Sequence, residues 1–139
     1  MINSYTNTSL AVLTNEALNF NINSIKTGCT VTHSSGSTTF SLNKPGFYFV
    51  TFNGVGAATD TPVGNIIVQL QQNGVNVPGA LTSAASTTAL TDVESLSFST
   101  IIQVKPSCCA VDNNVNLTFV NTGIPTTFSN INVAITKLC

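Results

Sequence analysis

The run Pro45-Gly46-Phe47-Tyr48-Phe49-Val50-Thr51-Phe52-Asn53 is the densest apolar stretch of the sequence. It is too short and too aromatic for a helix, so it predicts a β-strand, in which side chains alternate between two faces. One face then carries Phe47, Phe49 and Thr51, and the other carries Tyr48, Val50 and Phe52. Because both faces are apolar, the strand needs two covers. We predict that one cover is the core of the domain and that the other is a second copy of the chain.

The composition excludes several classes of function. The chain has 139 residues, enough for one domain with a buried core, and only 6% of them are charged, against about 25% in an average soluble domain. It has no arginine, and its four lysines nearly balance its five acidic residues. A nucleic-acid partner or an electrostatically recruited membrane partner needs a basic surface, so we expect neither.

The sequence shows neither a membrane-spanning stretch nor a signal peptide. No stretch reaches the roughly 18 apolar residues that a membrane-spanning helix needs. The residues after Met1 lack the basic and apolar regions of a signal peptide. A polar surface of Asn, Thr, Ser and Gln is common on extracellular, glycan-facing and coat proteins. Composition alone does not decide among these three. Either the chain is exported by another route, or its natural N-terminus has been removed.

The rest of the chain follows a period of two, which is the pattern of β-strands. We predict roughly eight to ten short strands with turn signals about every 8–12 residues and no helix. A chain of this kind folds as a two-sheet sandwich, and a jelly roll is the common solution. We expect one domain over residues 1–139, with residues 1–8 as a loose lead-in.

The predicted strands divide by the character of their faces. Ile66–Gln71 and Asn114–Val120 are apolar on one face only, as expected of a sheet with one face in water. Gly46–Asn53 and Asn130–Leu138 carry apolar or small residues on both faces. A monomer would expose these side chains as a contiguous patch, so we predict a closed homo-oligomer.

Three stretches resemble a known family. Lys44–Phe52 resembles the Pro-Gly-aromatic-Tyr strand of TNF/C1q-like jelly rolls. Asn65–Gly79 and Ile131–Leu138 are similar to the C-terminal head of BclA-type collagen-like glycoproteins from the spore surface, or exosporium, of Firmicutes. The likeness extends from about Leu18 to Leu138. The sequence has no Gly-X-Y collagen tract, so it corresponds to an isolated head or to a stalkless relative.

The resemblance implies an all-β, ten-strand antiparallel jelly-roll sandwich that trimerises about a threefold axis. In that family the central and last strands lie side by side in the sheet that faces the axis. On this basis we place Tyr48, Val50, Phe52, Ala134 and Leu138 at the trimer interface.

The resemblance implies an extracellular or spore-surface location, or alternatively a virion, and it also implies a function. It is that of a non-enzymatic structural or trimerisation head of a bacterial surface or spore-coat collagen-like protein, with the chain itself as partner. The alternative is the receptor-binding or glycan-binding head of a phage tail fibre or adhesin, whose partner is a host or cell-surface glycan or protein.

Four cysteines are the first candidates for chemistry: Cys29, Cys108, Cys109 and Cys139. They allow three pairings within the chain and further pairings between chains, and free thiols are the alternative. Disulfides are the leading interpretation, because exposed thiols are a liability outside the cell. A zinc site needs a Cys-x₂₋₄-Cys spacing that adjacent cysteines do not supply, so we predict no metal and no cofactor.

The remaining polar candidates point to no reaction. His33 is the single histidine, and we interpret it as a loop residue rather than a catalytic base. Asp92 and Glu94 share one face of a strand, which is more typical of a solvated edge than of a glycosidase. Asp112-Asn113-Asn114 is a turn that lacks the acidic density of a calcium loop. We therefore predict no catalytic residues and no enzyme.

Overall fold

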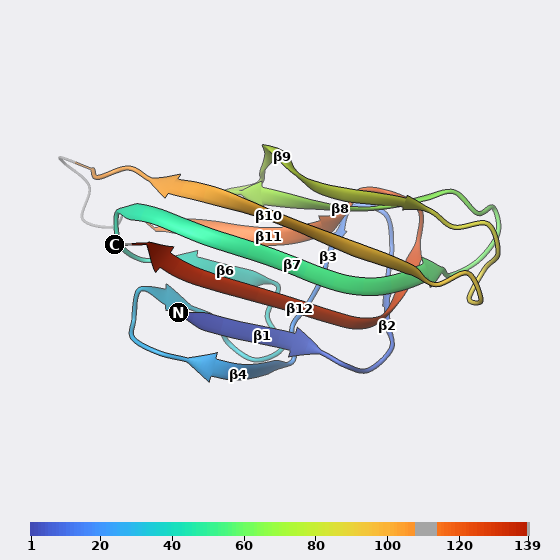
Figure 1. Ribbon diagram of the computed structural model, residues 1–139, viewed down its shortest axis with the longest axis horizontal. Helices are drawn as coiled ribbons and strands as arrows, with labels where there is room; N and C mark the ends of the chain where they lie inside the picture. Colours follow the sequence, from blue (N-terminus) through green and yellow to red (C-terminus); the bar gives the residue numbers. More distant parts are fainter. Residues whose placement is uncertain (108–113, 139) are drawn as a thin grey trace.

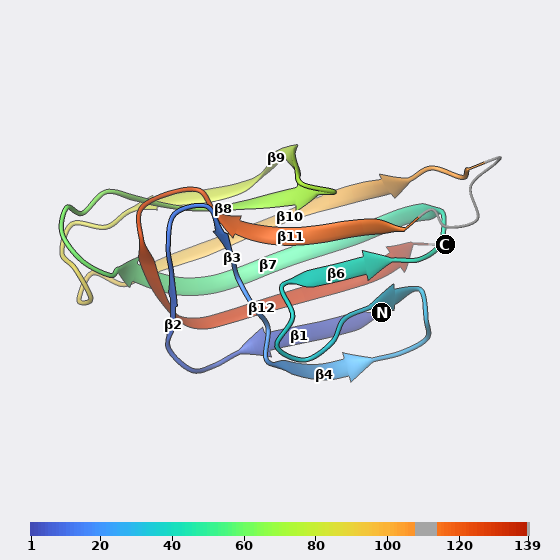
Figure 2. The same ribbon diagram turned by 180° about the vertical axis from the view of Figure 1, so that it is seen from behind.

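The computed structural model describes residues 1–107 and 114–138. Over these residues the chain forms two antiparallel sheets that pack face to face, and it forms no helix (Figures 1 and 2). The all-β sandwich is therefore confirmed. The described strands number twelve rather than ten, and three of them, β2, β3 and β5, are short pairings of two or three residues. No helix long and apolar enough to cross a membrane occurs in the described part of the chain.

Six strands make up the front sheet, which faces the viewer in Figure 1. Its order is β10 (Glu94–Val104), β7 (Gly46–Ala58), β12 (Thr126–Leu138), β1 (Ile2–Thr6) and β4 (Ile22–Lys26), with β2 (Leu10–Val12) also paired to β12. The back sheet has the order β5 (Val31–Thr32), β6 (Thr39–Leu42), β11 (Val115–Asn121), β8 (Asn65–Gln72) and β9 (Val75–Ala85), with β3 (Glu16–Ala17) also paired to β11.

The central and last strands are neighbours, as the resemblance implied. β7 pairs with β12 along almost its whole length, and Val50 lies opposite Ile135. The two strands predicted to have one apolar face, which correspond to β8 and β11, lie together in the back sheet. The division of strands by face character therefore matches the division between the two sheets.

The core between the sheets is built on β7. Tyr48, Val50 and Phe52 are fully buried inside the sandwich. The ring of Phe52 stacks on that of Phe119 in the back sheet, with centroids 5.6 Å apart. Burial of each such side chain contributes about 1.5–3 kcal/mol to folding. The Tyr48 hydroxyl donates to the Lys44 carbonyl at 2.6 Å, so its polar atom is also satisfied.

This core corrects one prediction. The placement of Tyr48, Val50 and Phe52 at a trimer interface is wrong, because the monomer already buries them completely. A period of two separates the faces of a strand but does not say which face is inward. The outward face of β7 carries Phe47 and Phe49 instead.

The N-terminus corrects a second prediction. Residues 1–8 are not a loose lead-in, since β1 pairs with β12 on one side and with β4 on the other. Its inward residues Ile2, Ser4 and Thr6 are buried. The Thr6 hydroxyl donates to the Asn19 carbonyl at 2.9 Å. A strand that points hydroxyls into the sandwich has no hydrophobic alternation, and for this reason the sequence did not reveal it.

The two ends of the sandwich carry different parts of the chain. Met1 and the last described residue of β12 lie at one end, and the loops at 59–64 and 86–93 lie at the other (Figure 1). The pairing of Ile2 with Ile135 keeps the two termini close. The predicted Asn73-Gly74 hairpin turn is present between β8 and β9, and its two residues have positive φ angles of 50° and 80°.

Candidate functional site

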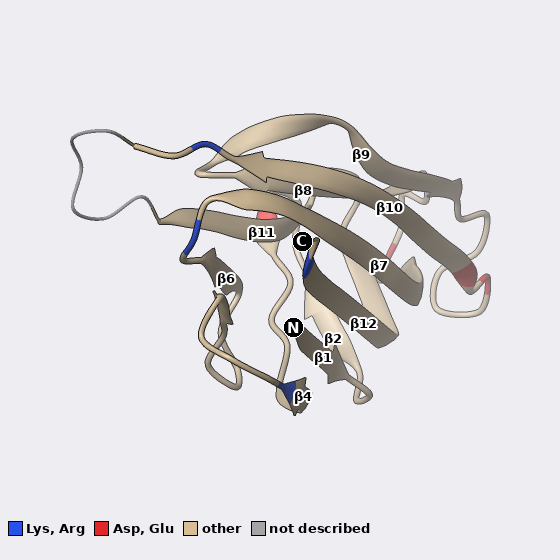
Figure 3. Cartoon of the chain, turned by 60° about the vertical axis from the view of Figure 1, so that its left-hand side comes forward, with Lys and Arg blue, Asp and Glu red and all other residues tan. Residues whose placement is uncertain are grey.

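The outward face of the front sheet is a broad surface without charge. It is formed by every second residue of four strands, and those residues are Ser95, Ser97, Ser99, Ile101 and Gln103 of β10, Phe47, Phe49, Thr51 and Asn53 of β7, Asn132, Ala134, Thr136 and Leu138 of β12, and Asn3 and Tyr5 of β1. We call this set the front face. Figure 3 shows the charged residues at strand ends and in loops, away from the middle of this sheet.

One end of the front face is apolar. Phe47 is 49% exposed, Phe49 38%, Ile101 57% and Leu138 39%. The register places Ile101 opposite Phe49 on one side of β7 and Leu138 opposite Phe47 on the other. These four side chains therefore form one contiguous patch, and such patches mark contact surfaces. Leu138 was predicted at an interface, whereas the patch also contains residues that were not.

The middle of the front face is flat and small. Thr51 lies between Ser99 and Ala134, so that three short side chains form a row across the sheet. Beside this row, an apolar hollow of about 140 Å³ is lined in part by Ile25, Phe49 and Ala134. Small side chains allow another backbone to approach closely. Ala134, the second outward residue that was predicted at an interface, lies in this region.

The far end of the front face is polar. Asn53 lies opposite Asn132, and the Asn132 amide donates to the Asn3 side-chain oxygen at 2.8 Å. The Ser24 hydroxyl donates to the same oxygen at 3.1 Å. Two shallow hollows of about 330 and 240 Å³ open here, and Asn53 and Ser97 line both. Amides and hydroxyls supply hydrogen-bond donors and acceptors to a partner without the cost of burying a charge.

His33 lies in a loop, as predicted, and its side chain is buried there. It directly follows β5 and is only 3% exposed. Its Nδ1 lies 2.7 Å from Asn23 Oδ1, and its Nε2 lies 2.9 Å from the Ser37 carbonyl oxygen. The ring stacks on Phe40 with centroids 4.2 Å apart. Because both ring nitrogens are occupied by structural partners, the ring is not placed to act as a base toward a serine.

The electrostatics of His33 follow from its burial. Removal from water disfavours the charged ring and lowers its pKa. The Ser37 carbonyl favours the charged ring and raises the pKa, while the nearby Lys26 ammonium lowers it. The net direction is downward, so the folded protein favours the neutral imidazole.

Asp92 and Glu94 lie where the loop at 86–93 joins β10. The Asp92 carboxylate accepts hydrogen bonds from the Thr87 amide at 2.6 Å and from the Thr87 hydroxyl at 2.8 Å. These bonds lower the pKa of Asp92, while hydrogen bonding and repulsion between the two carboxyls raise the pKa of Glu94. Asp92 therefore holds the loop before β10. The prediction that the two acidic residues share one face of a strand is wrong, because β10 begins only at Glu94.

The cysteine and acidic-turn predictions fall largely outside the described residues. Cys29 is an exposed free thiol. Cys108, Cys109, Asp112, Asn113 and Cys139 lie outside the described residues, so the disulfide interpretation stays a prediction. Over residues 1–107 and 114–138, no group of three or more His, Cys, Asp and Glu side chains is arranged to hold a metal ion.

Three solved structures share the fold of this chain. The TNF protein Eiger from S. frugiperda superposes with a TM-score of 0.66 at 12% identity, covering 99% of this chain and 92% of that one. The chain has the TNF-like jelly-roll fold. Murine APRIL at pH 5.0 superposes with a TM-score of 0.58 at 9% identity, covering 99% of this chain and 98% of that one. The PRD1 vertex protein P5 superposes with a TM-score of 0.57 at 15% identity, covering 99% of this chain and 96% of that one. No family model and no curated protein matches the sequence.

Identities this low establish the fold of the TNF-like chain and nothing finer. The TNF-like part of the predicted resemblance is thus confirmed, and the closeness to spore glycoprotein heads stays a prediction. Sequence reasoning identified Phe47 and Phe49 as one of two apolar faces of β7 but did not select that face for the interface, and it missed Ile101. A signal was present, because Ile101 sits among serines in an alternating strand and is the single large apolar residue at its outward positions.

Proposed function

We propose that this TNF-like chain is a non-enzymatic trimerisation head, in which three copies meet through the front face. The observation that carries the proposal is the contiguous exposed patch of Phe47, Phe49, Ile101 and Leu138 on an otherwise uncharged sheet. Apolar area removed from water contributes about 25 cal/mol per Å², so an unpaired patch of this kind favours association.

Self-association suits the front face better than a charged partner does. None of its residues carries a charge, so identical copies can meet there without repulsion. Its polar end offers Asn53, Asn132 and Asn3, whose amides can both donate and accept hydrogen bonds with a copy of themselves. In TNF/C1q-like heads the sheet with the central and last strands faces the threefold axis. The same sheet carries the patch here.

A structural role at a surface is the finer part of the proposal. Met1 and the end of β12 lie at one end of the sandwich, so a stalk or anchoring segment attached there would leave the opposite loops outermost (Figure 1). This arrangement suits the head of a spore-surface or other extracellular filament protein. Both ring nitrogens of His33 contact structural partners, and the Asp92 carboxylate accepts a hydrogen bond from a loop amide. These contacts support a role without catalysis.

A receptor-binding head is the second candidate, and the outermost loops favour it. Val63, Leu90 and Val93 are exposed there. The loops are also tied together, since the Ser86 amide donates to the Gly64 carbonyl at 2.9 Å. A rigid tip with exposed apolar side chains could contact a cell-surface glycan or protein. The fold shared with a vertex protein of PRD1 agrees with a virion location for such a head.

Two measurements on the purified chain separate these roles. A trimer that resists heat and detergent, with no signal on a glycan array, supports the structural head. Reproducible binding that is abolished by substitutions within residues 57–63 or 80–91 supports the receptor-binding head. A chain that is monomeric at all concentrations contradicts both.

A further inference from the structure

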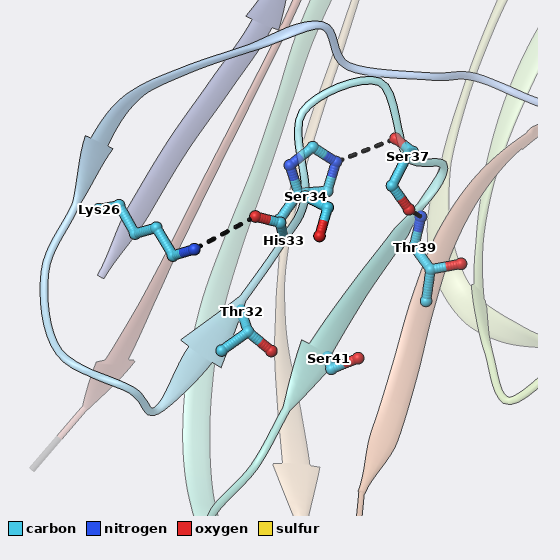
Figure 4. Close-up of a pocket in the computed structure, with 7 residues that line it drawn as sticks. All are labelled: Lys26, Thr32, His33, Ser34, Ser37, Thr39 and Ser41. Carbon is cyan, nitrogen blue, oxygen red and sulfur yellow. Dashed lines mark hydrogen bonds between the residues drawn. The ribbon is translucent and has the colours of Figure 1, made fainter.

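A polar hollow opens at the edge of the sandwich, outside the front face. It lies where β4 of the front sheet meets β5 and β6 of the back sheet, and it has a volume of about 220 Å³. Its lining consists of one lysine, the buried histidine and five hydroxyl residues, namely Lys26, His33, Thr32, Ser34, Ser37, Thr39 and Ser41 (Figure 4). The lining includes no Asp or Glu, so the hollow has one fixed cation and no carboxylate.

Two of the hydroxyls are prepared to donate. The Thr32 oxygen accepts a hydrogen bond from the Asn43 amide at 3.2 Å. The Ser37 hydroxyl oxygen accepts one from the Thr39 backbone amide at 3.1 Å. Because each oxygen serves as an acceptor within the protein, its own hydrogen is left to donate to a ligand.

Lys26 adds charge and further donors. Its ammonium reaches the His33 carbonyl at 3.5 Å, a long contact compared with the usual 2.9–3.0 Å (Figure 4). An ammonium carries three donors, so this contact leaves donors that can turn toward the hollow. Lys26 also lies close enough to His33 to lower the pKa of the imidazole, which shows that its positive field extends over this site.

The floor of the hollow is held in place by the surrounding structure. His33 Nε2 contacts the Ser37 carbonyl at 2.9 Å, and the Ser37 amide donates to the Ser34 carbonyl at 2.9 Å. Gly36 closes the turn with a φ of 82°, a conformation that favours glycine. Its amide donates to the Phe20 carbonyl at 2.8 Å. A site whose donors are positioned before binding loses less entropy when a ligand arrives.

We propose that this hollow binds a single oxyanion, namely a carboxylate, sulfate or phosphate group. Lys26 supplies the charge, and the Thr32 and Ser37 hydroxyls donate hydrogen bonds to the anionic oxygens. Its volume is below the roughly 300–1,000 Å³ of sites for drug-sized ligands, so one acidic group with its immediate attachment fits. The site lies at the edge where β4 meets β5 and β6, and none of its lining residues belongs to the front face. We therefore expect binding to remain possible in a trimer that forms through the front face.

His33 makes the test direct, because it is the single histidine of the chain and gives one set of imidazole NMR signals. We would titrate the 139-residue chain at pH 7.5 and follow these signals with sodium sulfate, sodium phosphate and N-acetylneuraminic acid, at constant ionic strength set by sodium chloride. Galactose serves as the neutral sugar. The inorganic anions and the sugar acid distinguish a free oxyanion from one carried on a glycan.

The expected result is a saturable shift with at least one of the anions and no shift with galactose. Lys26→Gln should weaken that binding by about ten-fold or more, because it removes a charge-assisted hydrogen bond. Thr32→Val should weaken it by a smaller factor. Lys44→Gln is the matched control, since it removes the same charge from an exposed lysine outside the lining and should leave binding unchanged.

Three results would overturn the proposal. The first is the absence of a saturable shift with every anion beyond the effect of sodium chloride. The second is equal binding by the Lys26→Gln and wild-type chains, with both shown to be folded by their dispersed NMR spectra. The third is binding of galactose as tight as that of the sugar acid.

Discussion

Ile101 of β10 lies directly opposite Phe49 of β7, and both side chains stand on the outward face of the front sheet. Large apolar residues in direct cross-strand register on an exposed face are unusual in a monomer. We therefore predict that Phe49→Asp or Ile101→Asp weakens trimer formation by about a hundred-fold or more, because each copy would bring an unpaired charge into the interface. Sedimentation velocity over a concentration series measures the loss.

The matched control for these variants is Val75→Asp. Val75 is the most exposed of the large apolar residues described, and it lies at the turn into β9 in the back sheet. The same change in chemistry should leave the trimer intact there. A trimer that survives Phe49→Asp, or dissociates equally with Val75→Asp, would show that the front face is not the interface.

The two faces of β7 should respond differently to truncation. Phe52 is fully buried, so Phe52→Ala should lower the free energy of unfolding by about 3–5 kcal/mol. Phe47 is half exposed, so Phe47→Ala should change the free energy of unfolding of a monomer by no more than about 0.5 kcal/mol. Urea denaturation in the Phe49→Asp background separates folding from assembly. Equal losses for the two variants would contradict the assignment of faces.

Asn121 should be essential for the end of the sandwich near β2. Its buried side chain donates to the Val12 carbonyl at 3.1 Å and to the Ile124 carbonyl at 2.8 Å, and it accepts from the Gly123 amide at 3.0 Å. Asn121→Ala leaves these buried groups unpaired, so we expect a loss of about 2–4 kcal/mol in urea denaturation. The exposed Asn76→Ala should cost less than about 0.5 kcal/mol. Similar losses at both sites would contradict this account.

Stability should fall on mild acidification because of His33. Its pKa in the folded chain lies below the unfolded value of 6.5, so the unfolded chain binds the proton more tightly. His33 therefore contributes its full share to the free energy of unfolding above pH 6.5. This share is lost as the pH falls from 6.5 toward the lower pKa of the folded chain. One proton limits the slope to about 1.4 kcal/mol per pH unit. Urea midpoints between pH 7.5 and 5.5 measure it.

The control for acid sensitivity is His33→Asn, which removes the titrating ring. This variant should show a flatter pH dependence over the same range, even if it is less stable throughout. A wild-type midpoint that rises as the pH falls would mean that the Ser37 carbonyl outweighs burial, and would contradict the assigned direction.

The fold was predictable from sequence because apolar side chains recur at every second position wherever one face of a strand is apolar. β7, β8, β10, β11 and β12 all carry that signal, and the sandwich class follows from them. β1 escaped prediction because its inward positions include Ser4 and Thr6, whose hydroxyls are satisfied by hydrogen bonds rather than by apolar packing.

The candidate surfaces were only partly predictable. Alternation identified two apolar faces on β7, but the choice between them depends on packing against Phe119 and on the hydrogen bond of the Tyr48 hydroxyl. The polar hollow could not be predicted, since Lys26, Thr32 and Ser37 come from separate elements that only the folded chain brings together. Hydroxyl residues are also too common in this sequence for any one to stand out.

The central claim is that the front face joins three copies of the chain, and sedimentation equilibrium of the wild-type chain tests it most directly. The monomer has a mass of 14.5 kDa. We predict a single species of three times that mass at micromolar concentration. A species that fits the monomer mass across the whole concentration range would contradict the claim.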